Sequence, residues 1–217
     1  MFIGHYGVSL AAKRIAPEVS LGSLFIAVQA LDILFGSFVL AGVEHMRIVP
    51  GFTQYNPYDL YDVTVSHSLV AALLWSSLAA VGYFFRASWR AAAVVGGAVF
   101  SHFLLDLPMH TPDLPIARGS GPKLGLGLWN HPVAAVLAEL LAFGVGALLY
   151  ARFVPRVTTR LRWFFVAMFV LTVGTSLFPT PPSPAAFAVQ ALVAYVALAY
   201  YAAWVERSAS GQTQHET

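Results

Sequence analysis

Residues 91–108 read AAAVVGGAVFSHFLLDLP, a stretch apolar enough to cross a membrane that nevertheless contains a histidine and an aspartate. His102 and Asp106 are four residues apart, so a helix through this stretch places both side chains on one face. An ionisable group near the centre of a bilayer is costly unless it is paired, hydrated or bound to a metal. The stretch therefore predicts both a membrane helix and a buried polar site.

The composition places the whole chain in the membrane class. Of its 217 residues, 58% are hydrophobic and 10% are charged, whereas soluble domains are about 25% charged. The net charge of +2 is small and scattered, which argues against a nucleic-acid partner. The chain has no cysteine, so a metal site would have to use histidine and carboxylate ligands. The preference for arginine over lysine is typical of a GC-rich bacterial genome.

The hydropathy pattern predicts an all-α, polytopic membrane bundle. A span needs about 20 apolar residues, and six segments qualify: 21–43, 63–85, 91–108, 131–150, 161–179 and 185–205. The apolar stretch 1–12 is too short to cross, so we expect a half-inserted helix there, buried against the bundle. Residues 1–207 form a single integral membrane domain in this interpretation, and 208–217 form a disordered polar tail.

The basic residues predict the orientation. Counted over the connections, nine of the 12 lysines and arginines fall on one side and three on the other. The positive-inside rule places the richer side in the cytoplasm, together with both termini. We therefore expect a multi-pass protein of the bacterial inner membrane.

Two connections on the outward side are long for so small a membrane protein. They comprise residues 44–62, rich in tyrosine and aspartate, and residues 109–130, rich in glycine and proline. Loops of this length often carry function. By contrast, the proline-rich connection PTPPSP, 179–184, reads as a structural turn.

The ionisable residues inside the spans are expected to meet beneath these loops. At 1.5 Å per residue, the outer half of the bundle receives Asp32, His67, His102 and Asp106. His131 enters from the same side, and His5 joins only if the N-terminal helix dips inward. We expect the first four side chains to converge within about 4–6 Å, as ligands of one ion must. Imidazole and carboxylate suit zinc, with manganese or iron as alternatives.

These residues resemble a known family. The run GHYG near the start, Asp32, SHSL at 66–69 and the H-x-x-x-D of SHFLLD are similar to the bacterial inner-membrane-associated metal-dependent hydrolases. Over residues 1–150, the resemblance implies that the metal-site residues are His5, Asp32, His67, His102 and Asp106. The family commonly has Pro-Asp-x-Asp where this chain has only Asp32, and the missing carboxylate weakens the case for a two-metal site.

A second, partial resemblance concerns the substrate. H-x-x-x-D followed by His110 is similar to zinc-dependent phospholipase C, although the trailing histidine comes slightly earlier here. This resemblance implies a phosphoester lipid as a substrate class. Phosphatidic-acid-type phosphatases also contain H-x-x-x-D, but their other motifs are missing from this chain.

Each candidate also has a structural interpretation. The pair His102 and Asp106 could form a plain intrahelical hydrogen bond, Asp32 could partner a buried glutamine, and His67 could be an interfacial residue. Glu139, in the middle of the fourth span, could be a general base, a ligand or a buried protonated acid. His110 and Asp113 are expected at the mouth of the site, and His45 and His215 in solvent.

The sequence favours a membrane-embedded hydrolase that acts on a lipid or lipid-linked ester or phosphoester. In this hypothesis the five family-matched residues bind the metal and Glu139 is the base. A small permease, using the same groups as an ion or proton relay, is the alternative, and it predicts a polar path to the cytoplasmic face. A membrane scaffold is the third possibility, and it predicts dispersed polar contacts without convergence.

Overall fold

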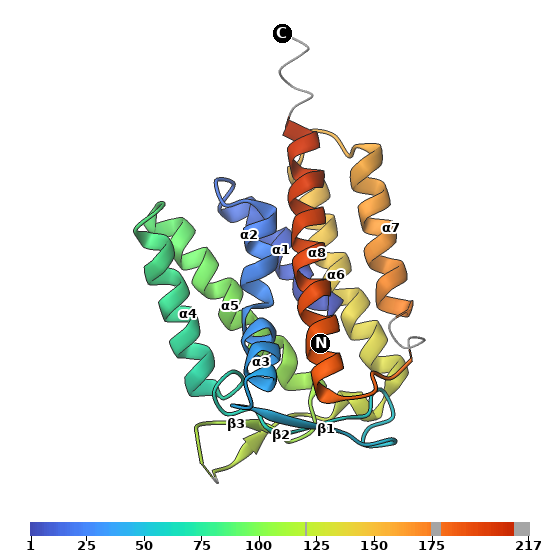
Figure 1. Cartoon of the computed structure of the whole chain (residues 1–217). Coiled ribbons are helices and arrows are strands. Elements are labelled where there is room, and N and C mark those ends of the chain that lie inside the picture. Colours follow the sequence, from blue (N-terminus) through green and yellow to red (C-terminus); the bar gives the residue numbers. More distant parts are fainter. Residues whose placement is uncertain (120, 175–178, 211–217) are drawn as a thin grey trace.

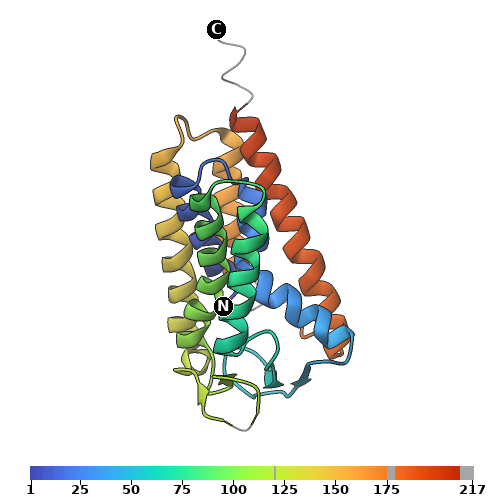
Figure 2. The ribbon, with the colours of Figure 1, turned by 90° about the vertical axis from the view of Figure 1, so that its left-hand side faces the viewer.

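The protein is a helical bundle closed at one end by two small hairpins (Figures 1 and 2). The computed structural model describes residues 1–119, 121–174 and 179–210, the last three of these without their side chains. The α-helices in these ranges are α1 (Ile3–Ile15), α2 (Leu21–Val28), α3 (Ala30–Leu40), α4 (Leu69–Phe84), α5 (Trp89–Met109), α6 (Pro132–Phe153), α7 (Thr159–Gly174) and α8 (Pro184–Ser210). The all-α prediction is therefore confirmed for the bundle and wrong for the hairpins.

The predicted number of six spans is not supported. Within the described residues, three helices are long and apolar enough to cross a membrane: α5, α6 and α8. The pair α2 and α3, bent by 57°, would make a fourth span if it is counted as one. The structure therefore shows three to four candidate membrane spans.

Two predicted spans correspond to described helices of only 16 residues each. Residues 63–68 do not join the predicted second span, because they turn across the end of the bundle, and α4 begins only after the Ser68 side chain caps its first turn. Its 16 residues extend about 24 Å, less than the hydrocarbon core of about 30 Å. The predicted span 161–179 is described as a helix only to Gly174, and residues 175–178 lie outside the described ranges.

The N-terminal segment forms α1, a non-spanning helix buried inside the bundle against α6 (Figure 2). The two backbones touch where two glycines meet. A Cβ atom on Gly7 would lie 2.1 Å from the Ala142 carbonyl oxygen, and one on Gly146 would lie 2.0 Å from the Gly7 carbonyl oxygen. Larger residues would separate the helices, so this contact is what brings the start of α1 into the core.

The two ends of the bundle differ in character. The long connections form two antiparallel hairpins, β1 (His45–Ile48) with β2 (Tyr58–Asp62) and β3 (Leu114–Pro115) with β4 (Lys123–Leu124), and a 3₁₀ turn, η1 (Leu128–Asn130). They lie at the lower end in Figure 1, whereas the α1–α2, α4–α5 and α6–α7 connections lie at the upper end. The predicted tail lies largely outside the described residues, since α8 continues to Ser210 and 211–217 are not described.

Candidate metal centre

Helix α5 presents His102 and Asp106 on successive turns of one face, and His110, the residue that caps its C-terminus, follows on the same side. His102 Nε2 lies 3.1 Å from Asp106 Oδ2, and His110 Nε2 lies 3.5 Å from the same oxygen. All three side chains are buried. The i, i+4 spacing in the sequence therefore becomes a line of ligand-type atoms that faces the inside of the bundle.

Asp32 and His67 complete the cluster from two other elements. Asp32 is on α3, and His67 is in the turn before α4; His67 Nε2 lies 3.3 Å from Asp32 Oδ1 and 3.3 Å from His102 Nε2. Asp32 Oδ1 is also 3.6 Å from His102 Nε2. The convergence that the sequence predicts is thus observed for Asp32, His67 and His102, and Asp106 joins this group through the two histidines.

The spacing of Asp32, His67 and His102 fits a single bound ion, and Asp106 lies at the edge of this group. Five separations among the four ligand atoms range from 3.1 to 3.9 Å, the longest being that between His67 Nε2 and Asp106 Oδ2. In a tetrahedral site with bonds of about 2.0–2.1 Å, two ligand atoms lie about 3.4 Å apart. The half-buried Asp32 and the buried His67 and His102 can therefore hold a metal ion.

A relay of hydrogen bonds fixes the tautomer of His67. The buried Glu44 carboxylate accepts the backbone N–H groups of Val65 and Ser66, and its Oε2 accepts the Ser66 hydroxyl at 2.6 Å. Because the single hydroxyl proton of Ser66 is used there, Ser66 Oγ must accept from His67 Nδ1, 2.8 Å away. The proton of His67 is on Nδ1, which leaves the lone pair of Nε2 directed at the cluster.

His102 is oriented in the same way by a break in a helix. Its Nδ1 donates to the Val28 carbonyl at 2.7 Å, at the point where α2 ends and α3 begins. Inserting a side chain into the backbone ladder is a known cause of sharp helix bends, and the 57° bend lies here. In the neutral ring, the lone pair of His102 is therefore on Nε2 and also points into the cluster.

With both imidazoles neutral, the centre holds two carboxylates and one positive charge, the Met1 ammonium beside Asp106. Two Nε2 lone pairs, from His67 and His102, face one another at 3.3 Å beside two carboxylates. Metal-binding histidines characteristically donate their other ring N–H to a carbonyl, carboxylate or similar acceptor. The arrangement is therefore one that a divalent cation would stabilise.

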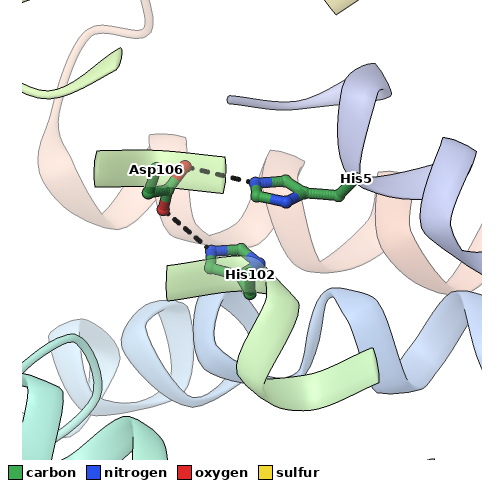
Figure 3. A group of neighbouring side chains, drawn as sticks. All are labelled: His5, His102 and Asp106. Atoms are coloured by element: carbon green, nitrogen blue, oxygen red, sulfur yellow. Dashed lines mark ion pairs between the residues drawn. The ribbon is translucent and has the colours of Figure 1, made fainter. Parts of the chain in front are cut away.

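His5 lies against this cluster, as predicted for a helix that enters the bundle. Its ring stacks on that of His102 with centroids 3.9 Å apart, and its Nε2 lies 3.2 Å from Asp106 Oδ1 (Figure 3). Neither ring nitrogen of His5 makes a hydrogen bond, although the residue is fully buried. The Met1 ammonium lies 2.6 Å from the same Asp106 oxygen.

Glu139, which we expected to be a base, holds the start of α1 in place. Its Oε1 accepts the backbone N–H of Phe2 and its Oε2 that of Gly4, each at 2.8 Å. A carboxylate at a helix N-terminus satisfies free N–H groups and interacts favourably with the helix dipole. The structure thus gives this buried residue a contact that positions His5, the residue directly after Gly4.

Three residues around the centre were not singled out by sequence reasoning. Tyr195 donates its hydroxyl to Asp32 Oδ2 at 2.8 Å, and Glu44 and Ser66 form the relay described above. Ser66 had one signal in the sequence, its position directly before the candidate ligand His67. Glu44 and Tyr195 had no such signal. His131 and His45, by contrast, are exposed and belong to no described cluster.

His110 belongs to the centre more closely than its loop position suggested. Its Nδ1 is 2.9 Å from Asp113 Oδ1, and its ring packs on Trp129. Burial opposes protonation of the imidazole, but the carboxylates of Asp106 and Asp113 outweigh it and raise the pKa of His110. Its Nε2 faces Asp106.

A cavity of about 650 Å³ opens beside the centre. Its polar lining includes Asp32, His67, Asp106 and His110. The rest is largely apolar and comes from α3, α7, α8 and the connection before β2. A volume of this size suits a drug-sized organic ligand, and the polar atoms gather at one part of its wall.

Comparisons of the chain with family models, with curated proteins and with solved structures found no match.

Proposed function

We propose that the protein is a membrane-embedded, metal-dependent hydrolase that cleaves an ester or phosphoester bond in a lipid or lipid-linked substrate. The observation that carries the proposal is the convergence of His67, His102, Asp32 and Asp106, with both histidines held in the ligand tautomer. Zinc fits the spacing and the ligand types best, with manganese or iron as alternatives. A divalent ion polarises an ester or phosphoryl oxygen and acidifies water.

The residues around the ion would position the reacting groups. Tyr195 holds one oxygen of Asp32, so that the other faces the centre. His110 lines the cavity with its Nδ1 held by Asp113, which leaves Nε2 as the nitrogen available to accept or return a proton. Glu139 remains a candidate base, but two backbone donors already occupy its oxygens.

The cavity supports the proposed substrate class. Aromatic and aliphatic side chains line most of it, including Phe35, Leu171, Phe187 and Leu198. The acyl or prenyl part of a lipid would bury its apolar surface against them, while the bond to be cleaved would lie at the polar wall. We place the hairpin end, and hence the site, on the outer side of a bacterial inner membrane, because the basic connections lie at the opposite end of the bundle.

The resemblance of the His and Asp motifs to inner-membrane metal-dependent hydrolases agrees with this proposal. The same five residues that the resemblance selects are those that meet around Asp106 and Asp32. We therefore propose membership of that family as part of the same hypothesis.

The test is a direct assay for hydrolysis. The purified chain, loaded with Zn²⁺ or Mn²⁺ in detergent, is incubated with phospholipids, neutral acylglycerols and polyprenyl phosphates, and the products are identified by mass spectrometry. We expect one class to be cleaved by the wild type and by the control His131→Ala, whose side chain is exposed, but not by His102→Ala. Absence of cleavage by the metal-loaded wild type in every class would contradict the proposal.

One observation favours a proton-coupled permease as a second candidate. His5, Ser9 and Lys13 are buried at successive turns of α1 and lead from the centre toward the basic end. However, the Ser9 hydroxyl is bound by the Leu24 carbonyl, and Lys13 is bound by backbone carbonyls and Glu206. Proton uptake into proteoliposomes that Ser9→Ala abolishes would support the permease over the hydrolase.

A further inference from the structure

His102 can serve only one ion, although two clusters of ligand atoms include it. One cluster is His5, His102 and Asp106, and the other is Asp32, His67 and His102. The Nδ1 of His102 is bound to the Val28 carbonyl, so that only Nε2 carries a free lone pair. An ion held by His67, Asp32 and His102 leaves His5 without a place in its coordination sphere unless His5 points at the same spot.

The geometry of the two stacked rings shows that His5 points at a different spot. The planes of His5 and His102 are within 7° of parallel, with centroids 3.9 Å apart. The lone pair of an imidazole lies in its ring plane, so an ion in line with one ring lies well outside the plane of the other. Two ions, one in line with each ring, would be about 4 Å apart, which is the upper end of the about 3.5–4 Å found in two-metal sites.

Asp106 has the orientation of a bridging ligand between two such positions. Its Oδ2 lies 3.1 Å from His102 Nε2, and its Oδ1 lies 3.2 Å from His5 Nε2 (Figure 3). Each oxygen therefore faces a different histidine at the separation expected of two ligands on a common ion. A carboxylate that uses one oxygen for each of two ions spans the distance between them.

The His5 side chain is otherwise unexplained. It is 0% exposed, and its Nε2, although close to Asp106, does not have the geometry of a hydrogen bond. A buried imidazole without hydrogen bonds is costly, and Glu139 holds the start of its helix firmly against the centre. The structure thus aims a buried ring nitrogen that makes no hydrogen bond at Asp106 Oδ1, the oxygen that the Met1 ammonium also contacts.

We propose that the centre binds a second divalent ion, between His5 Nε2 and Asp106 Oδ1, with Asp106 bridging it to the first ion. This inference rests on the proposed function, because it extends the same centre. The Met1 ammonium contacts Asp106 Oδ1 in the structure, so the second ion must displace a positive charge already attracted there. The remaining coordination positions would open toward the cavity, whose wall includes Asp106 and Met1.

Metal stoichiometry and magnetic coupling test the proposal without any need for activity. The full chain, stripped with a chelator in detergent, is titrated with Zn²⁺ and the bound ions per chain are counted; a parallel sample is loaded with Mn²⁺ for EPR spectroscopy. We expect two ions per wild-type chain and a spin-coupled manganese spectrum, since ions that share a carboxylate at about 4 Å interact magnetically. His5→Phe, which keeps a stacking ring but removes the donor nitrogens, should bind one ion and give an uncoupled spectrum.

The control His131→Phe, at an exposed histidine, should match the wild type. Saturation of the wild type at one ion, or two coupled ions in His5→Phe, would overturn the second site and leave the proposed function standing. Binding of no ion by the wild type would overturn both. If His5→Phe does not fold, the wild-type stoichiometry and EPR spectrum decide the question alone.

Discussion

The relay from Glu44 through Ser66 to His67 gives a sharp prediction about metal affinity. In Ser66→Ala, the His67 Nδ1–H loses its acceptor, while Glu44 keeps the backbone N–H groups of Val65 and residue 66. The imidazole is then free to turn or to change tautomer. Both changes remove the Nε2 lone pair from the centre.

The size of the effect follows from the position of Ser66 next to a ligand. Loss of an outer hydrogen-bond partner of a metal-binding histidine lowers metal affinity about 10–100-fold. This corresponds to about 1.4–2.7 kcal/mol of binding free energy. Ser66→Thr retains the hydroxyl and should recover most of the affinity.

Zn²⁺ affinity is measured in detergent by competition with a chromophoric chelator. The matched control is Ser77→Ala, because Ser77 is an exposed serine on α4 whose hydroxyl bonds only to the Leu73 carbonyl. We expect wild-type affinity for the control and a weakened affinity for Ser66→Ala. Equal affinities for the two alanine variants would refute the reasoning, because the relay would then not orient His67.

Three other perturbations have defined outcomes. Glu139→Gln places an amide N–H against one of the Phe2 and Gly4 backbone donors. The variant should therefore be less stable than the wild type by about 1–3 kcal/mol. Unchanged stability and metal content with loss of hydrolysis would instead establish Glu139 as a general base. Gly146→Ala forces α1 and α6 apart and should lower the free energy of unfolding by about 1–3 kcal/mol, as measured by thermal denaturation. Gly144→Ala should leave the stability unchanged, because a Cβ atom there would have no neighbour within 4 Å. Similar melting temperatures for the two variants would disprove the tight crossing of α1 and α6. Zn²⁺ at about 100 times its Kd should stabilise the folded state by about 2.7 kcal/mol relative to chelated protein, and an unchanged melting temperature would show that the ion does not bind the native centre.

The ligand cluster could be predicted because its signals are local or physically costly. The His102–Asp106 pair shares a helix face by its spacing alone, and Asp32 is conspicuous because a carboxylate in an apolar helix needs a partner. Depth along each span then placed these groups together. Their convergence required only that the helices pack as a bundle.

The remaining features depend on contacts between distant parts of the chain. Tyr195 reaches Asp32 across 163 positions, and Glu44 reaches Ser66 across 22. Neither the polar turn at 63–68 nor the bend at Gln29 has a proline or glycine to announce it. The number of spans was overestimated because composition alone does not show that α4 begins only at Leu69, or that the apolar segment 21–43 is broken at Gln29.

Glu139 shows how a correct physical argument can leave a role open. A carboxyl in the middle of an apolar span does need an explanation, and the structure supplies one in the Phe2 and Gly4 amides. Sequence periodicity cannot reveal that a short helix from elsewhere in the chain will begin at this point. The contact follows from the docking of α1 on α6.

The most direct test of the account is elemental analysis of protein purified without chelators. The account predicts stoichiometric zinc, or manganese or iron, in the wild type and in His131→Ala, and a loss of most of that metal in His102→Ala. Equal metal content in the His102→Ala and His131→Ala proteins would contradict it, because the ligand atoms that meet near the C-terminal end of α5 would then not be the ones that hold the ion.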